Sequence, residues 1–369
     1  MAANIHSRNT APALSASPDF ARISAFTNLP GSDSLTAMKA IAPGKLILSG
    51  EHAAVYGKPA VAMAIDRSVT ATIEETPEDV AFDLPGKERQ SFTLRALRDF
   101  RRRAVNNYQL FLEGKLGIRD VLNKPVDLFK YGFITVLDGL HHSLDSGIVI
   151  KLKSNLPMGS GLGSSAASVL SELRALGHYL RVDFKPDWYY NFSMEAEKLQ
   201  HGHPSGVDSY ISLYGGAAVF QNGRARSIPL PRMKMFLVET GLPESTTGEC
   251  VVQVKTNFET DKIWDDFEAV TGAVEQAVCS ANCGMMRALI RENHQLLCRI
   301  GVVPEPVRKF IAEIENSGGA AKICGAGAVR GTAGGAVIVF ADSMPVALAA
   351  KYGYKISPLR GDPLGTRIV

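Results

Sequence analysis

Residues 156–167 read LPMGSGLGSSAA, which is the strongest local signal in the sequence. It follows an apolar segment at residues 147–153 (GIVIKLK) that predicts a strand, and it leads into a predicted helix at residues 164–180. Three glycines within five residues allow the backbone to turn tightly and to bring several N–H groups close to a ligand. The N-terminus of the following helix adds partial positive charge. The stretch therefore predicts a phosphate-binding loop, and the alternative is a glycine-rich turn with a serine N-cap.

Eight residues of this loop are predicted to bind phosphate: Pro157, Gly159, Ser160, Gly161, Leu162, Gly163, Ser164 and Ser165. The last two serines lie where a hydroxyl can cap the helix or ligate a phosphate-bound metal. Two other phosphate motifs do not fit. No lysine follows the last glycine, which argues against a P-loop. The glycines have the spacing G-x-G-x-G, whereas the dinucleotide-binding motif has G-x-G-x-x-G followed by an acidic residue about 20 positions later. No suitable acid follows here, so the match to that motif is weak.

Composition and charge exclude several classes of protein. The chain has 369 residues, 46% of them hydrophobic and 21% charged, which is typical of a globular protein with two or three domains. A net charge of +3 argues against a protein that grips nucleic acid. No run approaches the roughly 18 to 20 apolar residues of a membrane-spanning helix. Five cysteines favour a reducing compartment, and we expect a cytoplasmic protein. Cys279 and Cys283 lack a second pair at zinc spacing and are interpreted as small buried hydrophobes.

The order of predicted elements favours an α+β fold over a doubly wound parallel sheet, because strands dominate first and helices follow. Residues 1–37 are rich in Ala, Ser, Thr and Pro and are predicted to be disordered; two Asp and only two Arg argue against a transit peptide. Strands are expected at residues 38–49 (two, around a Pro-Gly turn), 61–74, 147–153, 215–220, 235–239 and 336–340. Helices are expected at 95–116, 164–180, 188–200 and 305–316, and residues 263–301 hold helical patterns. Residues 75–93 look turn-rich, and the arginines at 95–103 are interpreted as a solvated helix face.

A second candidate segment is PGKLILSGEHAAVYG at residues 43–57. Lys45 enters an apolar strand, where it either extends its ammonium to solvent or meets an anion. Glu51 and His52 follow in a Gly-Glu-His turn and could orient a substrate. Taken alone, His52 is more often a structural histidine.

A third segment, EKLQHGHPSGVD at residues 197–208, places two carboxylates around a break in a helix. Glu197 lies on the predicted helix, and a turn delivers Asp208 on its far side. Two carboxylates so placed suit one metal ligand and one proton acceptor. His201 and His203 lack the third partner of a zinc site and are interpreted as turn residues. A fourth segment, KICGAGAVRGTAGGA at residues 322–336, is a second glycine loop, which indicates that two lobes meet over one ligand.

Together, and in this order, the four segments resemble the GHMP small-molecule kinases from about residue 38 onward. Within that superfamily, GEHAAVYGKPAVA, HGHPSGVD and TGLPESTT (residues 240–247) look most like the mevalonate kinases. The resemblance implies a two-lobed α+β fold with a ribosomal-S5-like N-terminal lobe at residues 38–225 and an α+β sandwich at residues 226–369. It also implies transfer of a phosphoryl group from ATP to the primary hydroxyl of mevalonate. Another small-molecule acceptor (phosphomevalonate, homoserine or a sugar) is the alternative, and a non-catalytic ligand sensor is a weaker one.

The resemblance also assigns roles to residues. Ser165 and Glu197 correspond to ligands of Mg²⁺, Asp208 to the catalytic base, Lys45 to the lysine that pairs with it, and Thr246 to a residue near the γ-phosphate. The residues expected on the substrate side are Glu51, His52, Gly325, Gly327 and Arg330. The expected partners are ATP and a small-molecule substrate, with no nucleic acid and no membrane, and a homodimer is left open.

Two positions depart from the superfamily pattern. Its third motif is usually an unbroken GAGGGGC run, whereas this chain has the longer GAGAVRGTAGG with Arg330 inside it. Ser209 follows Asp208 where Asn is usual. The first departure bears on the contacts to the substrate.

Overall fold

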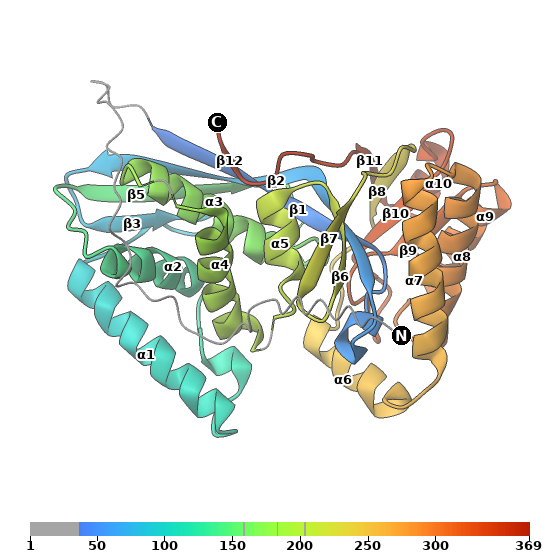
Figure 1. Cartoon of the computed structure of the whole chain (residues 1–369), viewed down its shortest axis with the longest axis horizontal. Helices are drawn as coiled ribbons and strands as arrows, with labels where there is room; N and C mark the ends of the chain where they lie inside the picture. Colours follow the sequence, from blue (N-terminus) through green and yellow to red (C-terminus); the bar gives the residue numbers. More distant parts are fainter. Residues whose placement is uncertain (1–36, 158, 183, 203) are drawn as a thin grey trace, which may run out of the picture.

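The computed structural model describes residues 37–157, 159–182, 184–202 and 204–369, and it contains two β-sheets with helices packed against them (Figure 1). The mixed composition of strands and helices confirms the predicted α+β class. The predicted disordered extension lies outside the described residues except for residue 37, and so does His203. Within the described ranges, no helix is long and apolar enough to cross a membrane.

The larger sheet is mainly antiparallel and has the strand order β12-β1-β2-β5-β3-β4; in addition, β6 pairs with β2 and β7 pairs with β6. Its strands are β1 (Met38–Ser49), β2 (Ala60–Thr76), β3 (Val80–Asp83), β4 (Gln90–Phe92), β5 (Gly147–Ser154), β6 (Ala217–Gln221), β7 (Arg224–Ile228) and β12 (Arg367–Ile368). The helices that follow its strands in the first part of the chain are α1 (Leu94–Leu112), α2 (Pro125–Gly139), α3 (Ser164–Tyr179), α4 (Pro186–His201) and α5 (Val207–Tyr214). Of these, α1, α2 and α4 lie below the sheet in Figure 1.

The smaller sheet is antiparallel throughout, with the order β11-β8-β10-β9. Its strands are β8 (Met235–Glu239), β9 (Ala320–Ile323), β10 (Ala336–Phe340) and β11 (Lys355–Leu359). The remaining helices are α6 (Thr247–Phe258), α7 (Ile263–Cys279), α8 (Cys283–Arg299), α9 (Glu305–Asn316) and α10 (Val346–Lys351), with the short 3₁₀ turns η2 (Ala53–Tyr56) and η3 (Ile118–Asp120). The predicted lobe boundary after residue 225 falls inside β7, and β12 returns to the larger sheet.

Several predicted elements differ from the structure. Residues 38–49 form one strand rather than two, because the Pro-Gly pair is absorbed by a register shift between Pro43 and Lys45. The helical patterns expected over residues 263–301 form two helices, α7 and α8, which are separated by a turn at Ala281 (φ 52°) before the N-cap Asn282. The supposedly turn-rich residues 75–93 contain β3 and β4.

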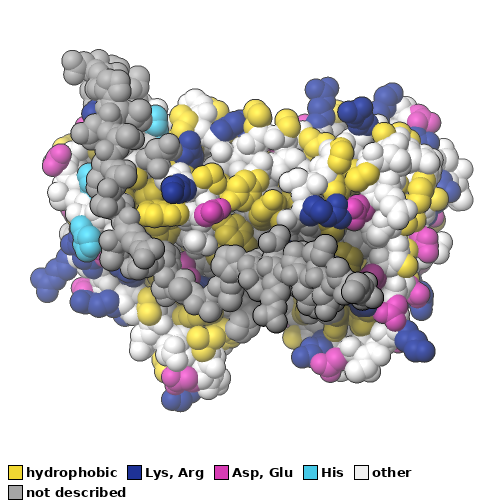
Figure 2. Space-filling model, viewed as in Figure 1, with side chains coloured by type: hydrophobic (Ala, Val, Ile, Leu, Met, Phe, Trp, Pro, Cys, Tyr) yellow, Lys and Arg dark blue, Asp and Glu magenta, His cyan; other side chains and the backbone are white. Residues whose placement is uncertain are grey.

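Cys279 and Cys283 are exposed, so the prediction that they are buried hydrophobes is wrong. They end α7 and begin α8, and the ends of this helix pair face solvent. The arginines of α1 lie mainly on its exposed face as predicted, and Arg98 and Arg101 both pair with Asp138. On the face shown in Figure 2, Lys and Arg are interspersed with Asp and Glu instead of forming one basic stripe.

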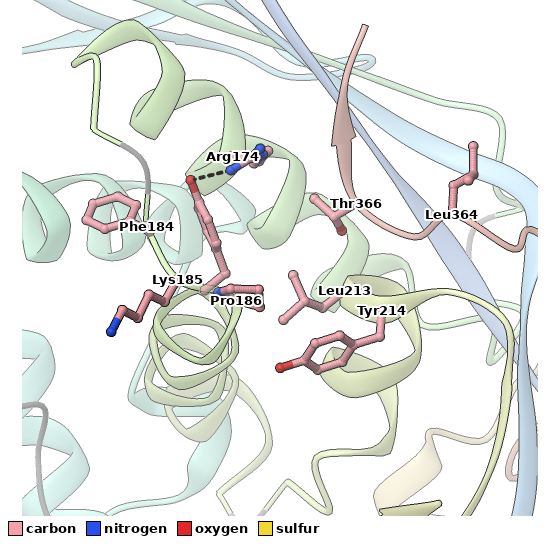
Figure 3. A pocket seen from close by; sticks show the side chains of 9 residues that line it. Arg174, Phe184, Lys185, Pro186, Leu213, Tyr214, Leu364 and Thr366 are labelled. Atoms are coloured by element: carbon pink, nitrogen blue, oxygen red, sulfur yellow. Dashed lines mark hydrogen bonds between the residues drawn. The ribbon is translucent and has the colours of Figure 1, made fainter. Parts of the chain in front are cut away.

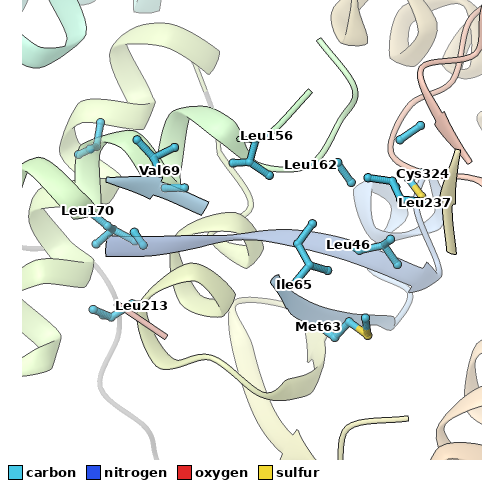
Figure 4. Packing of buried hydrophobic residues seen from close by; sticks show 14 of the residues in the cluster. Leu46, Met63, Ile65, Val69, Leu156, Leu162, Leu170, Leu213, Leu237 and Cys324 are labelled. Carbon is cyan, nitrogen blue, oxygen red and sulfur yellow. The ribbon is translucent and has the colours of Figure 1, made fainter. Parts of the chain in front are cut away.

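One hydrophobic core joins the elements around the two glycine loops. Leu46 of β1, Leu162 of the first loop, Leu237 of β8 and Cys324 of the second loop are all buried in it (Figure 4). Burial of these apolar side chains stabilises the structure by about 25 cal/mol per Å². Because this core includes residues of both glycine loops, close packing holds the backbones of the two loops in fixed positions.

A carboxylic acid is buried between α2 and α3. Glu172 is fully buried, and both of its carboxyl oxygens lack a hydrogen-bond partner within the described part of the chain. A Cβ added to Gly132 of α2 would lie 3.5 Å from Glu172 Oε2. Burial raises the pKa of Glu172 well above its ordinary value, so the folded protein holds this proton where the unfolded chain releases it.

Replacement of Glu172 by Gln is expected to change how stability depends on pH. As the pH rises above the ordinary carboxyl pKa, the wild-type free energy of unfolding should fall, because the unfolded state binds fewer protons than the folded state. The contribution of Glu172 to this slope is about 1.4 kcal/mol per pH unit, up to its raised folded pKa. The variant should lose that contribution in urea unfolding curves recorded between about pH 5 and about pH 8. Equal slopes for both proteins would contradict the assignment.

Candidate active site

The first glycine loop folds as its sequence predicts. Gly159, Gly161 and Gly163 have φ angles of 65°, 75° and 70°, which glycine adopts without steric cost. Gly163 is the N-cap residue of α3, and in the described part of the chain no side-chain hydrogen bond caps that helix end. The serine N-cap proposed as the alternative is therefore absent, and the first amides of the 16-residue α3 follow the loop directly.

The two glycine loops touch. A Cβ on Gly161 would lie 3.1 Å from the carbonyl oxygen of Cys324 and 3.2 Å from the Cα of Gly325. A Cβ on Gly335 would lie 3.6 Å from the Cα of Ser160. The two loops therefore meet, while the shared ligand between two lobes stays a prediction. At Gly161 a side chain would crowd the backbone of the second loop, so glycine permits this close approach.

Replacement of Gly161 by Ala is expected to destabilise the protein by about 1 to 3 kcal/mol and to weaken ATP binding, because the new methyl group strains φ and pushes the two loops apart. Gly86→Ala is the matched control: Gly86 also has a positive φ (67°), but no described atom lies within 4 Å of its Cβ position. Urea unfolding should show a loss of stability in both variants, larger for Gly161→Ala. Isothermal titration should show weaker ATP binding in Gly161→Ala only. Unchanged ATP affinity in Gly161→Ala would separate this loop from nucleotide binding.

A lysine and an aspartate form an ion pair beside the first loop. Lys45 Nζ lies 3.1 Å from Asp208 Oδ1, with the lysine side chain 7% exposed and the aspartate side chain 38% exposed. The backbone N–H of Lys45 donates to the Leu162 carbonyl at 2.9 Å, and a Cβ on Gly163 would lie 2.8 Å from Lys45 Cγ. Asp208 lies in the first turn of α5 rather than in a loop. The pair therefore joins β1, α5 and the glycine loop at one point.

A buried carboxylate faces the start of α3. Ser165 Oγ donates to Glu197 Oε1 at 2.7 Å, and His201 Nε2 lies 3.5 Å from Glu197 Oε2 and 3.4 Å from Ser165 Oγ. Burial raises the pKa of Glu197 to about 8, the Ser165 hydrogen bond opposes that shift, and the negative charge of Asp208 adds to it. His201, predicted to be only a turn residue, belongs to this cluster. Its i, i+4 spacing from Glu197 on α4 is the signal that could have found it.

The segment after β1 reaches the second glycine loop. His52 is buried, and its Nε2–H donates to the Ala326 carbonyl at 3.0 Å. Burial lowers the pKa of His52, so the ring is neutral at physiological pH. Glu51 is also buried and forms an ion pair with Lys322, which gives its carboxylate an internal partner. Contact of Glu51 with a substrate stays a prediction.

The other residues expected near the substrate lie in or against the second loop. Gly325 and Gly327 have positive φ angles of 70° and 67°, and a Cβ on Gly327 would lie 2.1 Å from the Val302 carbonyl oxygen. Arg330 is exposed and forms an ion pair with Glu249 at 2.8 Å. The Arg330 guanidinium therefore has a carboxylate partner at the surface, and its contact with an anionic substrate stays a prediction.

Thr246 caps α6. Its Oγ1 accepts from the Glu249 N–H at 3.3 Å, and Glu249 Oε2 accepts from the Thr246 N–H at 2.7 Å, which completes a capping box. Arg119 of η3 donates to Thr246 Oγ1 at 3.0 Å from the side of the larger sheet. No sequence pattern predicted that contact.

Ser165 and Glu197 fit a magnesium site of a particular kind. Among the described residues, no cluster of three or more His, Cys, Asp or Glu side chains could by itself hold a metal ion. Magnesium often takes only one or two protein ligands and completes its shell with water and substrate phosphates. The hydroxyl and carboxylate, 2.7 Å apart beside the glycine loop, supply hard oxygen donors of the type that such a site needs.

The pocket drawn in Figure 3 is separate from this cluster and has a volume of about 480 Å³. It is lined by Arg174, Phe184, Lys185, Pro186, Tyr189, Leu213, Tyr214, Leu364 and Thr366. None of the residues predicted to act in binding or catalysis lines it, so the chemistry is better assigned to the loops than to this cavity.

Similarity to known proteins agrees with the geometry of the loops. The family model "GHMP kinases N terminal domain" matches residues 129–216, which include the first glycine loop, Glu197 and Asp208. The mevalonate kinase of Archaeoglobus fulgidus is 29% identical over 300 residues, covering 79% of this chain and 89% of that protein. These similarities support a GHMP superfamily protein.

Within the GHMP superfamily it is most like mevalonate kinase. The crystal structure of Methanococcus jannaschii mevalonate kinase matches with a TM-score of 0.74 and 25% identity, covering 89% of this chain and 99% of that one. Lactococcus lactis galactokinase complexed with galactose matches with a TM-score of 0.69 and 16% identity, over 91% of this chain and 96% of that one. The second likeness shows the fold alone. The GHMP fold is thus confirmed, and it does not by itself select the acceptor.

Proposed function

We propose that this protein transfers the γ-phosphoryl group of ATP to the primary hydroxyl of mevalonate, giving phosphomevalonate and ADP. The observation that carries the proposal is the Lys45–Asp208 pair, 3.1 Å apart and in contact with the first glycine loop. It places a carboxylate beside a candidate phosphate-binding loop. The similarity to mevalonate kinases along most of the chain supports mevalonate as the acceptor.

Asp208 is the group that receives or orients the acceptor hydroxyl. Its side chain is more exposed than that of Lys45, so an alcohol can reach it while the ammonium stays covered. A primary alcohol has a pKa far above that of a carboxylate, so full deprotonation before attack is implausible. Asp208 therefore accepts the proton late, in a loose transition state. Lys45 offsets the negative charge of the carboxylate and of the incoming phosphate.

The first glycine loop and the start of α3 bind the phosphates. Amides from Gly159 to Ser165 cradle phosphate oxygens, and the N-terminus of α3 adds partial positive charge. Ser165 and Glu197 would hold Mg²⁺, which would supply positive charge that offsets the charge of the phosphate oxygens. His201, whose Nε2 lies 3.5 Å from Glu197 Oε2, helps to orient the Glu197 carboxylate. Thr246 lies near the transferred phosphate, and the second loop, with Gly325, Gly327 and His52, surrounds the acceptor.

The test is a coupled ADP-release assay on purified protein with mevalonate, phosphomevalonate, galactose and homoserine as separate acceptors. Mevalonate-dependent ADP release, well above release with each other acceptor, supports the proposal. Turnover of another acceptor would keep the phosphotransferase and change its substrate. ATP binding without turnover of any acceptor would favour the ligand sensor, although retention of Lys45, Glu197 and Asp208 argues against one.

Replacement of Arg330 by Ala is expected to raise the KM of one substrate by roughly tenfold or more, the scale of a charged hydrogen bond. A raised KM for mevalonate alone would indicate that the Arg330 guanidinium binds the carboxylate of mevalonate. A raised KM for ATP alone would indicate that it binds the phosphates of ATP. Stability should change little, because an exposed ion pair contributes about 0 to 1 kcal/mol. Arg299→Ala is the matched control, since Arg299 forms a similarly exposed pair with Asp266. If neither KM moved more than about twofold, the pair with Glu249 would be the whole role of Arg330.

A further inference from the structure

A buried polar network crosses between the two sheets behind the candidate active site. Lys322 of β9 is fully buried, and its Nζ contacts Glu51 Oε1 and donates to the Ile47 carbonyl at 3.1 Å. Asn293 of α8 donates to Glu51 Oε2 at 3.4 Å. Both oxygens of Glu51 are therefore held by residues that lie more than 240 positions later in the sequence.

The network continues away from the active site. Ser49 Oγ donates to Asn293 Oδ1 at 3.2 Å and forms a hydrogen bond of 2.7 Å with Thr271 Oγ1 of α7. All the side chains of this network are at least nine-tenths buried: those of Ser49, Glu51, Thr271, Asn293 and Lys322. Lys322 and Asn293 contact Glu51 directly, whereas Thr271 is joined to the network through Ser49.

Stability alone does not account for such a pair. Taking two charges out of water costs several kcal/mol per ion, and well-packed apolar residues of similar volume are often as stabilising. A buried ion pair does, however, fix the relative position of the two chain segments that carry it, because any other arrangement leaves a buried charge unpaired.

Two consecutive residues of the turn after β1 reach the same short segment. Glu51 contacts Lys322, and His52 donates to the Ala326 carbonyl. Between those two contacts, the backbone of Cys324 and Gly325 lies against Gly161 of the first glycine loop. The turn after β1 therefore contacts the second glycine loop, which in turn contacts the first. The Glu51–Lys322 ion pair is the most deeply buried of these contacts.

We propose that Lys322 is a positioning residue: by pairing with Glu51 it fixes the turn that carries His52 against the second glycine loop, and it thereby sets the affinity for the acceptor. This inference rests on the proposed phosphotransfer, in which His52 and the second loop surround the acceptor. Lys322 itself is fully buried and acts through Glu51 and His52. The first glycine loop binds ATP largely through its own backbone, so the nucleotide should be affected much less.

The test is a double-mutant cycle with Lys322→Met, Glu51→Gln and the combined variant, each assayed with both substrates varied. Lys322→Met should raise the KM for mevalonate by about tenfold or more, because small misplacements of binding groups are costly. The KM for ATP should stay within about twofold. The combined variant restores charge balance, so its KM for mevalonate should be well below the product of the two single effects.

Thr271→Val is the matched control, because it removes a buried hydroxyl from the same network without touching Glu51. It should lower the melting temperature and leave both KM values within about twofold. The ¹⁵N signals of the His52 ring should move in Lys322→Met and stay in place in Thr271→Val. If Lys322→Met fails to fold, Asn293→Ala removes the other contact to Glu51 without leaving a charge unpaired, and it should raise the KM for mevalonate selectively.

Two outcomes would overturn the proposal. One is a folded Lys322→Met protein, or Asn293→Ala in its place, whose two KM values and His52 signals match wild type. The other is a combined variant whose effect on the KM equals the product of the single effects. Failure of the proposed function is distinguishable, because the wild-type protein would then turn over a different acceptor or none. If the wild-type protein turns over a different acceptor, the same double-mutant cycle, measured as the KM for that acceptor, tests the role of Lys322. With no turnover, His52 signals and acceptor binding by calorimetry test it.

Discussion

Replacement of Asp208 by Asn is expected to lower kcat by on the order of 10² or more while ATP binding stays nearly intact, as for a group that acts mainly in the transition state. The amide keeps the shape of the side chain but cannot accept the hydroxyl proton. It also loses the ion pair with Lys45, which leaves a nearly buried ammonium facing a neutral group. Single-turnover kinetics and calorimetric titration of ATP measure the two effects separately.

Asp187→Asn serves as the matched control for that experiment. Asp187 lies in the first turn of α4, the helix that carries Glu197, and its carboxylate accepts from Tyr214 Oη at 3.0 Å. Its replacement removes a hydrogen-bonded carboxylate outside the Lys45–Asp208 cluster, so kcat should stay within about twofold of wild type. If Asp208→Asn kept more than about half of the wild-type kcat, Asp208 would not be the proton acceptor.

The elements that the sequence predicted best are those with one apolar face or a short continuous apolar run. The predicted bounds of β8, α9 and β10 match the structure, because α9 buries Val307, Phe310, Ile311 and Ile314 along one stripe and the two strands are largely buried. Helix α2 was missed for the opposite reason. Its residues from 126 to 137 are all buried, so no polar face marks a helical period.

The candidate site divides in a similar way. The glycine loop, the two carboxylates and Lys45 could be located from the sequence because each lies in a motif whose residues are neighbours along the chain. Their convergence follows from the fold that the resemblance implied. Lys322 and Asn293 could not be found in that way, since their contacts to Glu51 span 271 and 242 residues and depend on how β9 and α8 pack behind β1.

The same limit affected how individual side chains were interpreted. Glu51 was expected to face a substrate, and only the tertiary structure reveals the lysine that neutralises it. His201 was set aside because a zinc site needs more ligands, yet its position one turn after Glu197 puts it beside a different polar cluster. A motif specifies the residue types that a reaction needs, whereas packing decides which of them remain accessible to a ligand.

Replacement of Glu197 by Gln is expected to raise the magnesium concentration needed for half-maximal velocity by about tenfold or more, because it removes the charged oxygen ligand of a hard cation. Ser165→Ala should act in the same direction with a smaller effect, since a hydroxyl is a neutral ligand. Calorimetric titration of ATP at several magnesium concentrations gives a readout that does not depend on turnover. There the two variants should bind ATP normally without magnesium and lose the gain in affinity that magnesium gives the wild type.

Glu195→Gln and Ser168→Ala are the matched controls for the magnesium experiment. Glu195 pairs with Lys198 on the same helix as Glu197, and Ser168 Oγ donates to the Ser164 carbonyl at 2.7 Å one turn from Ser165. Neither control removes an oxygen from the Ser165–Glu197 pair, so the magnesium dependence of both should match that of the wild type. The comparison separates metal binding from general damage to α3 and α4. An unchanged magnesium dependence in both Glu197→Gln and Ser165→Ala would mean that other residues hold the metal, and the chemistry would then rest on Lys45, Asp208 and the glycine loop alone.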